Sequence, residues 1–200
     1  MILRKRFYYF STGIARGEIV YFVHFIVFSK CKGKHLMLKM FNFMQKIKHM
    51  KDTFEVNLTS RKMLNAYFEN YTLEQLNKVP EGFTNNLIWN LGHIVVTQQL
   101  LVYKLSGLPM MVSDAMVEKY RKGTKPEGDV TQAEADEIKE LLFDTLHKLE
   151  TDYNNGIFVN YQEYPTSTGY ILKSVAGAIG FNNFHEGLHL GIMMSIRKFV

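Results

Sequence analysis

Apolar residues recur at steps of three and four in four stretches of the chain after Met50, the spacing that places them on one face of a helix. We predict helices over about residues 52–71, 85–106, 132–154 and 174–199. No segment alternates convincingly with a period of two, and residues 161–164 are the only short candidate for an extended piece. Four amphipathic helices with one long crossover, over residues 106–130, predict an all-α fold, a four-helix bundle.

Two of these helices carry a sequence signal for their first turn. Asp52 is followed three residues later by Glu55, and Thr131 is followed three residues later by Glu134. This spacing is typical of a capping box, in which the first side chain accepts a hydrogen bond from the backbone amide of the third residue after it. We therefore expect one helix to begin at Asp52 and another at Thr131.

The formal charge of +5 is unevenly distributed along the chain. Residues 1–49 hold ten Lys or Arg and one acid, Glu18, a net charge of +9, whereas residues 50–200 have a net charge of −4. Phosphate contacts need clustered cations, so nucleic acid is not expected as a partner of the second part. Because charge and periodicity both change at Met50, we predict that residues 1–49 form a leading segment outside the fold and residues 50–200 the bundle.

The leading segment contains one long apolar stretch, residues 19–28, which His24 interrupts. Ten residues are too few to span a bilayer, where about 20 are needed. Three interpretations stay open: Met50 is the natural start, the segment anchors the protein at a membrane surface, or it is a secretion signal. The first is favoured because the apolar stretch begins late for a signal and Ser29-Lys30-Cys31 lacks the small residues of a cleavage site. No membrane is expected as a partner of the bundle itself.

The chain has a single cysteine, Cys31. No disulfide can form within one chain, and no site with several thiolate ligands can be built. This usage fits a reducing, cytoplasmic setting.

The most informative stretch is Phe184-His185-Glu186-Gly187-Leu188-His189. Histidines four residues apart on a helix lie about 40° apart around the axis and about 6 Å apart along it, so both can reach one ion. Ile192 and Ile196 continue the same stripe, and we therefore expect both histidines to face the core. Two buried imidazoles without a shared partner would be destabilising, and a metal ion is the simplest such partner.

His93 is the candidate for a third ligand. It lies on the apolar face of the second predicted helix, four residues after Trp89 and four before Thr97. A lone core histidine is more often a packing residue, but beside an inward-facing pair of histidines it becomes a candidate ligand. His147 falls on the polar side of its helix and is expected to be solvated. The remaining histidines lie outside the predicted domain: His24, His35 and His49.

The same stretch also matches the HExxH signature of zinc proteases, in which Glu186 would be the general base. Ile192 and Ser195 stand where a metzincin would have Gly and His, and no acidic residue follows His189 to serve as a downstream ligand. The third ligand has to come from upstream, so protease activity is not expected.

Taken together, Asn86-Leu-Ile-Trp89-Asn-Leu-Gly-His93, His185-Glu-Gly-Leu-His189-Leu-Gly and the terminal Arg197-Lys198 resemble the DinB-like (YfiT-related) metal-binding superfamily. The resemblance covers about residues 52–200. It implies an up-down-down-up four-helix bundle and a ligand set of His93, His185 and His189. It also implies that the protein could form a homodimer through its helices.

Three histidine ligands leave coordination positions open, which is a mark of catalytic rather than structural metal sites. The ligand set suits one divalent ion, zinc, nickel, iron or manganese, without choosing among them. Members of the resembled superfamily include transferases that use low-molecular-weight thiols such as bacillithiol and mycothiol. We therefore expect a thiol S-transferase or a hydrolase that acts on small electrophilic molecules. The alternative is a non-catalytic stress protein that binds a metal or a small ligand.

Three further residues are candidates for roles around the metal. Glu186, the candidate catalytic residue, could move protons, accept a hydrogen bond from a ligand imidazole, or be a solvated charge. Asn90 and Asn182 each precede a candidate ligand by three residues and could hydrogen-bond to the ligands. For both, an ordinary polar position on a helix is an equally good interpretation.

Overall fold

The computed structural model describes residues 12–15, 18–21 and 32–200. The chain separates into two compact units, Met1–Lys46 and Ile47–Val200. In the first unit, β1 (Thr12–Ala15) and β2 (Glu18–Tyr21) pair antiparallel. The first part of the long helix α1 (Lys32–Asn70) also belongs to this unit.

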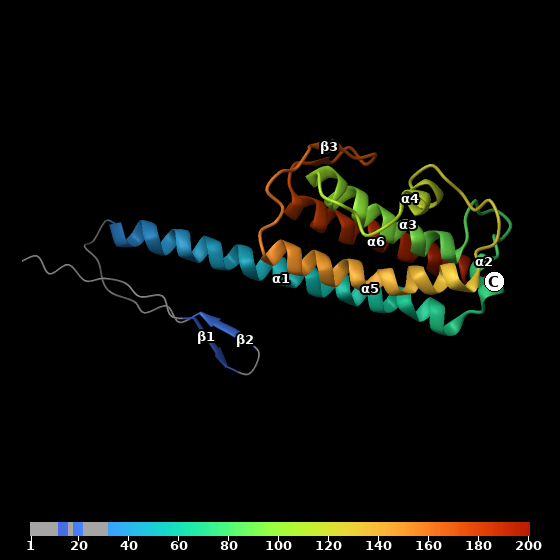
Figure 1. Cartoon of the computed structure of the whole chain (residues 1–200), viewed down its shortest axis with the longest axis horizontal. Coiled ribbons are helices and arrows are strands. Elements are labelled where there is room, and N and C mark those ends of the chain that lie inside the picture. Colours follow the sequence, from blue (N-terminus) through green and yellow to red (C-terminus); the bar gives the residue numbers. More distant parts are fainter. Residues whose placement is uncertain (1–11, 16–17, 22–31) are drawn as a thin grey trace, which may run out of the picture. The chain divides into compact units, whose positions relative to one another are not determined.

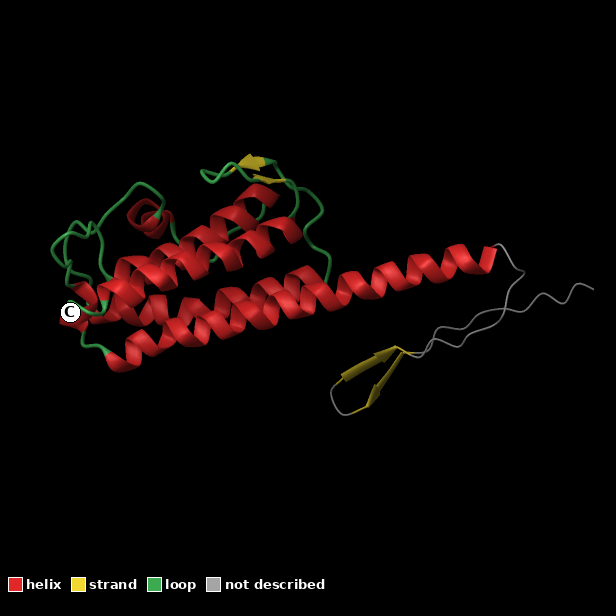
Figure 2. Cartoon of the chain, turned by 180° about the vertical axis from the view of Figure 1, so that it is seen from behind, coloured by secondary structure: helices red, strands yellow, loops and turns green. Residues whose placement is uncertain are grey.

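The second unit is an all-α bundle. Its elements are the rest of α1, α2 (Leu73–Asn77), α3 (Leu87–Val102), the 3-10 turn η1 (Lys104–Ser106), α4 (Asp114–Tyr120), α5 (Gln132–Asn154), β3 (Tyr164–Pro165), β4 (Ile171–Leu172) and α6 (Val175–Ile196). In Figure 1, α1 and α6 run in one direction and α3 and α5 in the other. The order is up-down-down-up, with one long crossover between α3 and α5 that contains α4, and this confirms the predicted bundle. Figure 2 shows β3 and β4 as a small hairpin before α6.

Side-chain caps fix where three of the bundle helices begin. Asn86, Thr131 and Ser174 each accept a hydrogen bond from a backbone amide of the first helical turn. The predicted capping box at Thr131 forms only in half. The carboxylate of Glu134 does not return to the cap but accepts a hydrogen bond from the Tyr120 hydroxyl at 2.6 Å. This contact ties α4 to the start of α5.

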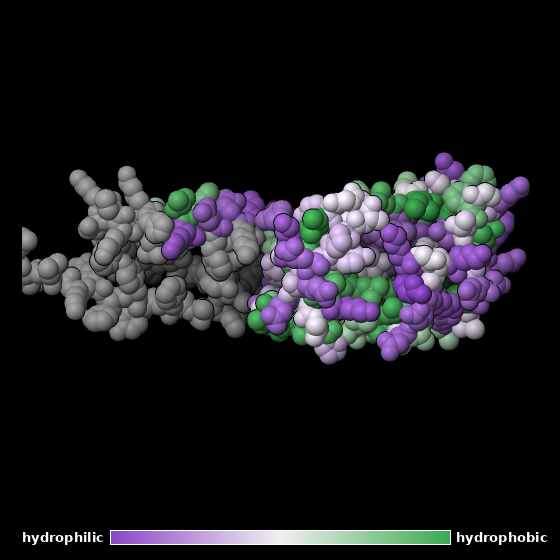
Figure 3. All heavy atoms as spheres, turned by 90° about the horizontal axis from the view of Figure 1, so that it is seen from above, coloured by the Kyte–Doolittle hydropathy of each residue, from purple (hydrophilic) through white to green (hydrophobic). Residues whose placement is uncertain are grey.

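Helix α3 lies at the centre of the bundle, and 14 of its 16 residues are buried. A helix that is apolar on most of its sides can be buried on all of them. The first ten residues of α3, Leu87-Ile-Trp-Asn-Leu-Gly-His-Ile-Val-Val96, are mostly apolar. Only Thr97 and Leu100 of α3 are partly exposed. In the face of the second unit shown in Figure 3, hydrophilic side chains are interspersed with exposed apolar ones.

The prediction that a helix begins at Asp52 is wrong, because α1 already begins at Lys32 and continues through this position. Residues 37, 41 and 44 are apolar, at steps of four and three, a helical stripe that the sequence interpretation missed. Their side chains, Met37, Phe41 and Met44, are exposed. The β1–β2 and β3–β4 pairs were not predicted as such, because strands of two to four residues are too short to show a period of two. The candidate extended piece at residues 161–164 overlaps β3 only at Tyr164. That residues 1–49 lie outside the fold stays a prediction.

None of the helices within residues 32–200 combines the length and the apolarity needed to cross a bilayer.

Candidate metal centre

The packing of α3 against α6 brings three histidines together. His93 comes from α3, and His185 and His189 come from α6. Their candidate ligand nitrogens all lie within 4.8 Å of one another, and Nε2 of His93 is 3.2 Å from Nε2 of His185. His93 is buried, whereas His185 and His189 are partly exposed. The structure therefore places the three sequence-predicted ligands around one point.

His93 is fixed in orientation by the crossover. Its Nδ1 lies 2.6 Å from the backbone carbonyl oxygen of Tyr120, at the end of α4. A carbonyl oxygen can only accept, so Nδ1 carries the proton and Nε2 keeps its lone pair for a metal. The indole ring of Trp89 stacks on the imidazole with centroids 4.7 Å apart. Gly92 allows Tyr120, at the end of α4, to lie close to α3, since a Cβ at position 92 would lie 2.7 Å from the Tyr120 ring.

His189 is oriented by Asn90, on the facing helix. Its Nδ1 lies 2.7 Å from Oδ1 of Asn90. The amide nitrogen of Asn90 donates to the backbone oxygen of Asn86, so the oxygen is the atom that faces the imidazole. Nδ1 of His189 is therefore the donor and Nε2 is free for a ligand bond. The structure brings Asn90 to His189, and not to the nearer histidine in the sequence, His93.

Thr97 is a residue of the site that the sequence interpretation did not single out. Its hydroxyl lies 3.3 Å from Nε2 of His93. The signal in the sequence is its spacing, four residues after His93 on the same helix, which places both side chains on one face.

The geometry and the protonation of the three histidines fit a divalent ion. Two imidazole nitrogens bound to one tetrahedral ion at about 2.0–2.1 Å would be roughly 3.3–3.4 Å apart, close to the 3.2 Å that separates the Nε2 atoms of His93 and His185. Burial, reinforced by the neighbouring histidines, lowers the pKa of His185 to about 3 and that of His189 to about 4. Burial also lowers the pKa of His93. All three are therefore neutral near pH 7, the form that coordinates metals. The three histidines could hold a metal ion.

Glu186 is fully buried, which excludes the interpretation of a solvated charge. Its Oε1 accepts hydrogen bonds from Nε and Nη2 of Arg61, at 3.0 and 2.7 Å, and from Nδ2 of Asn182 at 2.7 Å. Arg61, on α1, is also fully buried and donates from Nη1 to the backbone oxygen of Leu142. Within the described residues, no histidine donates to Glu186, and Asn182 contacts this carboxylate rather than a ligand imidazole. Glu186 thus forms a buried ion pair with Arg61, to which Asn182 adds a hydrogen bond, and these contacts connect α1, α5 and α6.

Arg61 was missed by the sequence interpretation, although the sequence holds a signal for it. It lies on the buried face of α1, three residues before Leu64 and seven after Phe54, both of which are buried. A cation on the apolar face of a helix needs a buried anionic partner.

The predicted stripe on α6 is partly wrong. Ile192 was expected to face the core, but its side chain is 38% exposed. The centre of the buried face instead follows Asn182, Glu186 and Met193, with the two histidines at its edge. Both stripes have helical spacing, and the pairing of Glu186 with Arg61 favours the second, because it turns Glu186 inward.

Three residues within about one turn of α6 each have a side-chain polar atom that is buried without a hydrogen-bond partner within the described residues: Oδ1 of Asn182, Nδ1 of His185 and Oε2 of Glu186. When Nε2 of His185 binds a metal, its Nδ1 is a donor, whereas the other two atoms are acceptors. The buried hydrogen-bond network around Arg61 therefore leaves donors and acceptors without partners at Asn182, His185 and Glu186.

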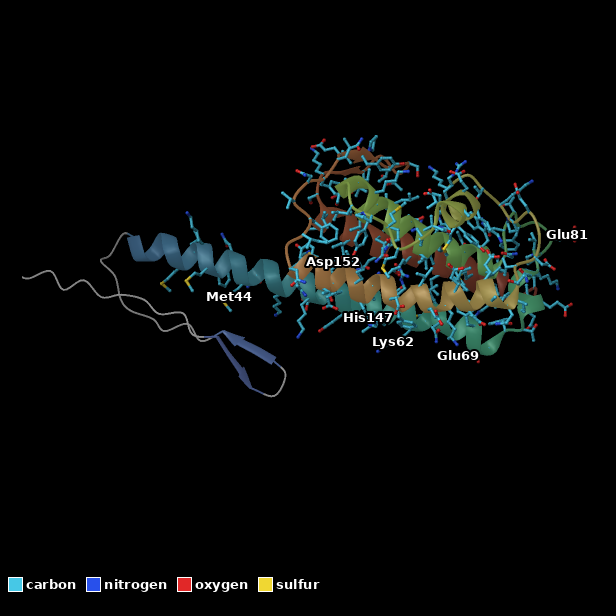
Figure 4. All side chains as sticks on the ribbon, viewed as in Figure 1. Met44, Lys62, Glu69, Glu81, His147 and Asp152 are labelled. Carbon is cyan, nitrogen blue, oxygen red and sulfur yellow. The ribbon has the colours of Figure 1, made fainter. Side chains whose placement is uncertain are left out.

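His147 does not belong to the site. It is exposed on α5, as predicted, and Figure 4 labels its position.

Comparison with known proteins identifies the family of this chain. The DinB superfamily matches residues 58–193, more than half of the chain, and this range contains all three histidines together with Arg61 and Glu186. No curated protein matches the sequence. The up-down-down-up order of the bundle helices and the family match over most of the bundle agree with each other. The chain belongs to the DinB superfamily.

Proposed function

We propose that this protein is a metal-dependent enzyme that binds one divalent ion through His93, His185 and His189. The reaction we propose is the transfer of a low-molecular-weight thiol to a small electrophilic molecule, or the hydrolysis of such a molecule. The observation that carries the proposal is the convergence of three neutral imidazoles, two of which are held by a hydrogen bond at Nδ1.

The ligand set supports catalysis rather than a structural role for the metal. Structural zinc sites have four protein ligands, whereas catalytic sites have three and keep a position open for water or substrate. In the part of the chain that the structure describes, no further His, Cys, Asp or Glu joins the cluster. His185 and His189 are partly exposed, which supports access to the open side from solvent.

The protein groups around the site have distinct tasks. An ion held by His93, His185 and His189 would supply the means to lower the pKa of a water or thiol and so to provide a nucleophile near neutral pH. The carbonyl of Tyr120 and the amide oxygen of Asn90 hold the rings of His93 and His189 in place. The hydroxyl of Thr97, which is 3.3 Å from Nε2 of His93, is placed to share a hydrogen bond with a group on the open side.

Exposed apolar side chains border the two histidines of α6. Leu188 and Ile192 are four residues apart, and each lies three residues from one of the histidines, on the outer side of the helix. Small-molecule sites are lined mostly by apolar side chains with a few polar groups. This border supports a substrate with an apolar part next to the electrophilic atom.

Metal analysis and a transfer assay test the proposal. The full-length protein, loaded in turn with zinc, nickel, iron or manganese, should contain one ion per chain and transfer a thiol from a panel of small thiols to an electrophile such as monochlorobimane. His93→Ala should lose the ion and the activity, and the matched control His147→Ala, at an exposed histidine, should keep both.

Two results would overturn parts of the proposal. Full metal content in His93→Ala would remove His93 from the ligand set. A stoichiometric ion without turnover for any thiol or hydrolysable ester would favour the alternative, a non-catalytic binding protein.

A further inference from the structure

Of the three candidate ligands, only His185 lacks a hydrogen bond at Nδ1 within the described residues. Nδ1 of His93 lies 2.6 Å from the backbone carbonyl oxygen of Tyr120. Nδ1 of His189 lies 2.7 Å from the amide oxygen of Asn90. Nε2 of His185 is 3.2 Å from Nε2 of His93, so Nδ1 is the nitrogen that carries the proton when the ring binds an ion. A buried N–H of this kind is costly to leave without an acceptor.

The amide oxygen of Asn182 is the complementary atom. This side chain is only 2% exposed, and its Oδ1 is buried without a hydrogen-bond partner within the described residues. Its Nδ2 donates to Oε1 of Glu186 at 2.7 Å. An ionised carboxylate only accepts, so this contact establishes which end of the Asn182 amide is the nitrogen and which is the oxygen. A donor and an acceptor without partners are therefore buried on the same helix.

The spacing on α6 favours Asn182 as the acceptor for His185. The two residues are three positions apart, and side chains at this spacing are neighbours on one face of a helix. Helical side chains lean towards the N-terminus, so the His185 ring leans towards the turn that contains Asn182. Glu186 also has an acceptor without a partner, Oε2, but consecutive residues lie about 100° apart around the helix axis. Asn182 is the better placed of the two.

The buried ion pair fixes the orientation of the Asn182 amide. Arg61 donates twice to Oε1 of Glu186, at 3.0 and 2.7 Å, and the same oxygen accepts from Asn182. Burial and the neighbouring histidines lower the pKa of His185, and the positive charge of Arg61 adds to this effect, so the imidazole lies within range of the ion pair. These contacts form a path from α1 to the turn of α6 that precedes His185.

We propose that Asn182 is the positioning residue of His185, and that its amide oxygen accepts the Nδ1 proton of the imidazole when Nε2 binds a metal ion. The oxygen of Asn90 has the same role for His189. The structure shows no direct hydrogen bond between Asn182 and His185. Because χ2 is broad for both His and Asn, a rotation of either side chain, or one bridging water molecule, joins the two atoms. The proposal rests on the metal site of the proposed function and not on its reaction.

Competition between the full-length protein and a zinc chelator tests the proposal. Asn182→Leu removes the acceptor and should bind zinc about 10–100-fold more weakly than the parent. Asn182→Ala removes the same acceptor and replaces the leucine variant if that variant does not fold. Asn183→Leu is the matched control, because Asn183 hydrogen-bonds to Asn57 and to the backbone of Thr53 on α1 rather than to a histidine. Its folded form should bind zinc like the parent.

The imidazole N–H protons of the zinc-loaded protein give a readout that a general loss of stability does not change. In NMR spectra of protein with isotopically labelled histidine, each ligand ring of the parent should show one N–H proton protected from exchange with water. Asn182→Leu should lose the protection of one of these protons, and Asn90→Leu that of a different one. Asn183→Leu should keep them all.

The outcomes separate this proposal from the proposed function. Unchanged zinc affinity and unchanged protection in Asn182→Leu would overturn the role of Asn182 and leave the ligand set intact. Weaker zinc binding with every N–H still protected would also overturn it, because another acceptor would then hold the proton. Equal losses in Asn182→Leu and Asn183→Leu would assign the effect to the packing of α6. A parent that binds zinc without turnover would overturn only the proposed reaction, and a parent that binds no zinc would overturn both.

Discussion

The buried ion pair between Arg61 and Glu186 allows the role of Glu186 to be tested directly. Both side chains are 0% exposed, and they are joined at 2.7 Å. Glu186→Gln leaves the guanidinium buried without an anion, and Arg61→Met leaves the carboxylate buried without a cation. Breaking one side of a fully buried pair typically costs about 3–5 kcal/mol.

This cost sets the size of the expected effect on the melting temperature. For a domain of 150–250 residues, 1 kcal/mol corresponds to roughly 2–4 °C, so each single variant should melt about 6–20 °C lower than the parent. The double variant Arg61→Met/Glu186→Gln removes both charges and should recover most of the loss, because replacing a whole buried pair is often close to neutral.

Thermal unfolding followed by circular dichroism, with and without added metal, is the assay. Glu55→Gln is the matched control, because its partner Lys51 and Glu55 itself are 72% and 65% exposed. Such exposed pairs contribute about 0–1 kcal/mol, so its melting temperature should change by no more than a few degrees. The metal content of each variant is measured at a temperature at which the variant is folded.

A structural role for Glu186 predicts that metal-loaded, folded Glu186→Gln keeps its activity in the transfer assay. This role is refuted if Glu186→Gln melts like the parent and binds metal normally while turnover falls by roughly 10²–10⁴, the signature of a lost proton-transfer group. A double variant whose loss equals the sum of the two single losses, and which therefore melts lower than either single variant, would show that the two side chains act independently rather than as a pair.

The geometry of the site leads to three more predictions. Asn90→Leu should bind metal about 10–100-fold more weakly in competition with a chelator, because it removes the acceptor for a ligand imidazole. Gly92→Ala should lower both the melting temperature and the metal affinity, since the added Cβ would lie 2.7 Å from the Tyr120 ring, whereas Gly191→Ala, where a Cβ would meet open space, should do neither. Burial lowers the pKa of His185 from 6.5 to about 3, so the unfolded chain binds more protons between these values. The metal-free protein should therefore lose stability as the pH falls from about 6.5 towards 3, measured by urea unfolding at several pH values.

Each of these predictions has a contrary outcome. Unchanged chelator competition in Asn90→Leu would mean that its contact does not orient the ligand. Equal behaviour of Gly92→Ala and Gly191→Ala would mean that α4 does not set the position of His93. A metal-free protein whose stability rises as the pH falls below 6.5 would contradict the lowered pKa values.

The sequence alone determined the features that depend on short spacing. The helices over 85–106, 132–154 and 174–199, and caps such as Thr131, follow from residues within a few positions of one another. The convergence of His93, His185 and His189 was also predicted. A pair of histidines four residues apart on one helix and an inward-facing histidine on another can face one another in few ways within a four-helix bundle. The thiol chemistry, the homodimer and the cytoplasmic setting stay predictions.

Only the tertiary structure decided how these elements meet. Arg61 and Glu186 are 125 residues apart, and Asn90 and His189 are 99 residues apart, so no local pattern relates them. On α6, a strongly apolar helix, two stripes fit the helical period equally well, and periodicity alone chose the one through Ile192. The buried guanidinium of Arg61 favours the other stripe, because a charge in the core has to meet its counter-charge. This pairing turns Glu186 inward and leaves His185 and His189 partly exposed at the edge of the buried face.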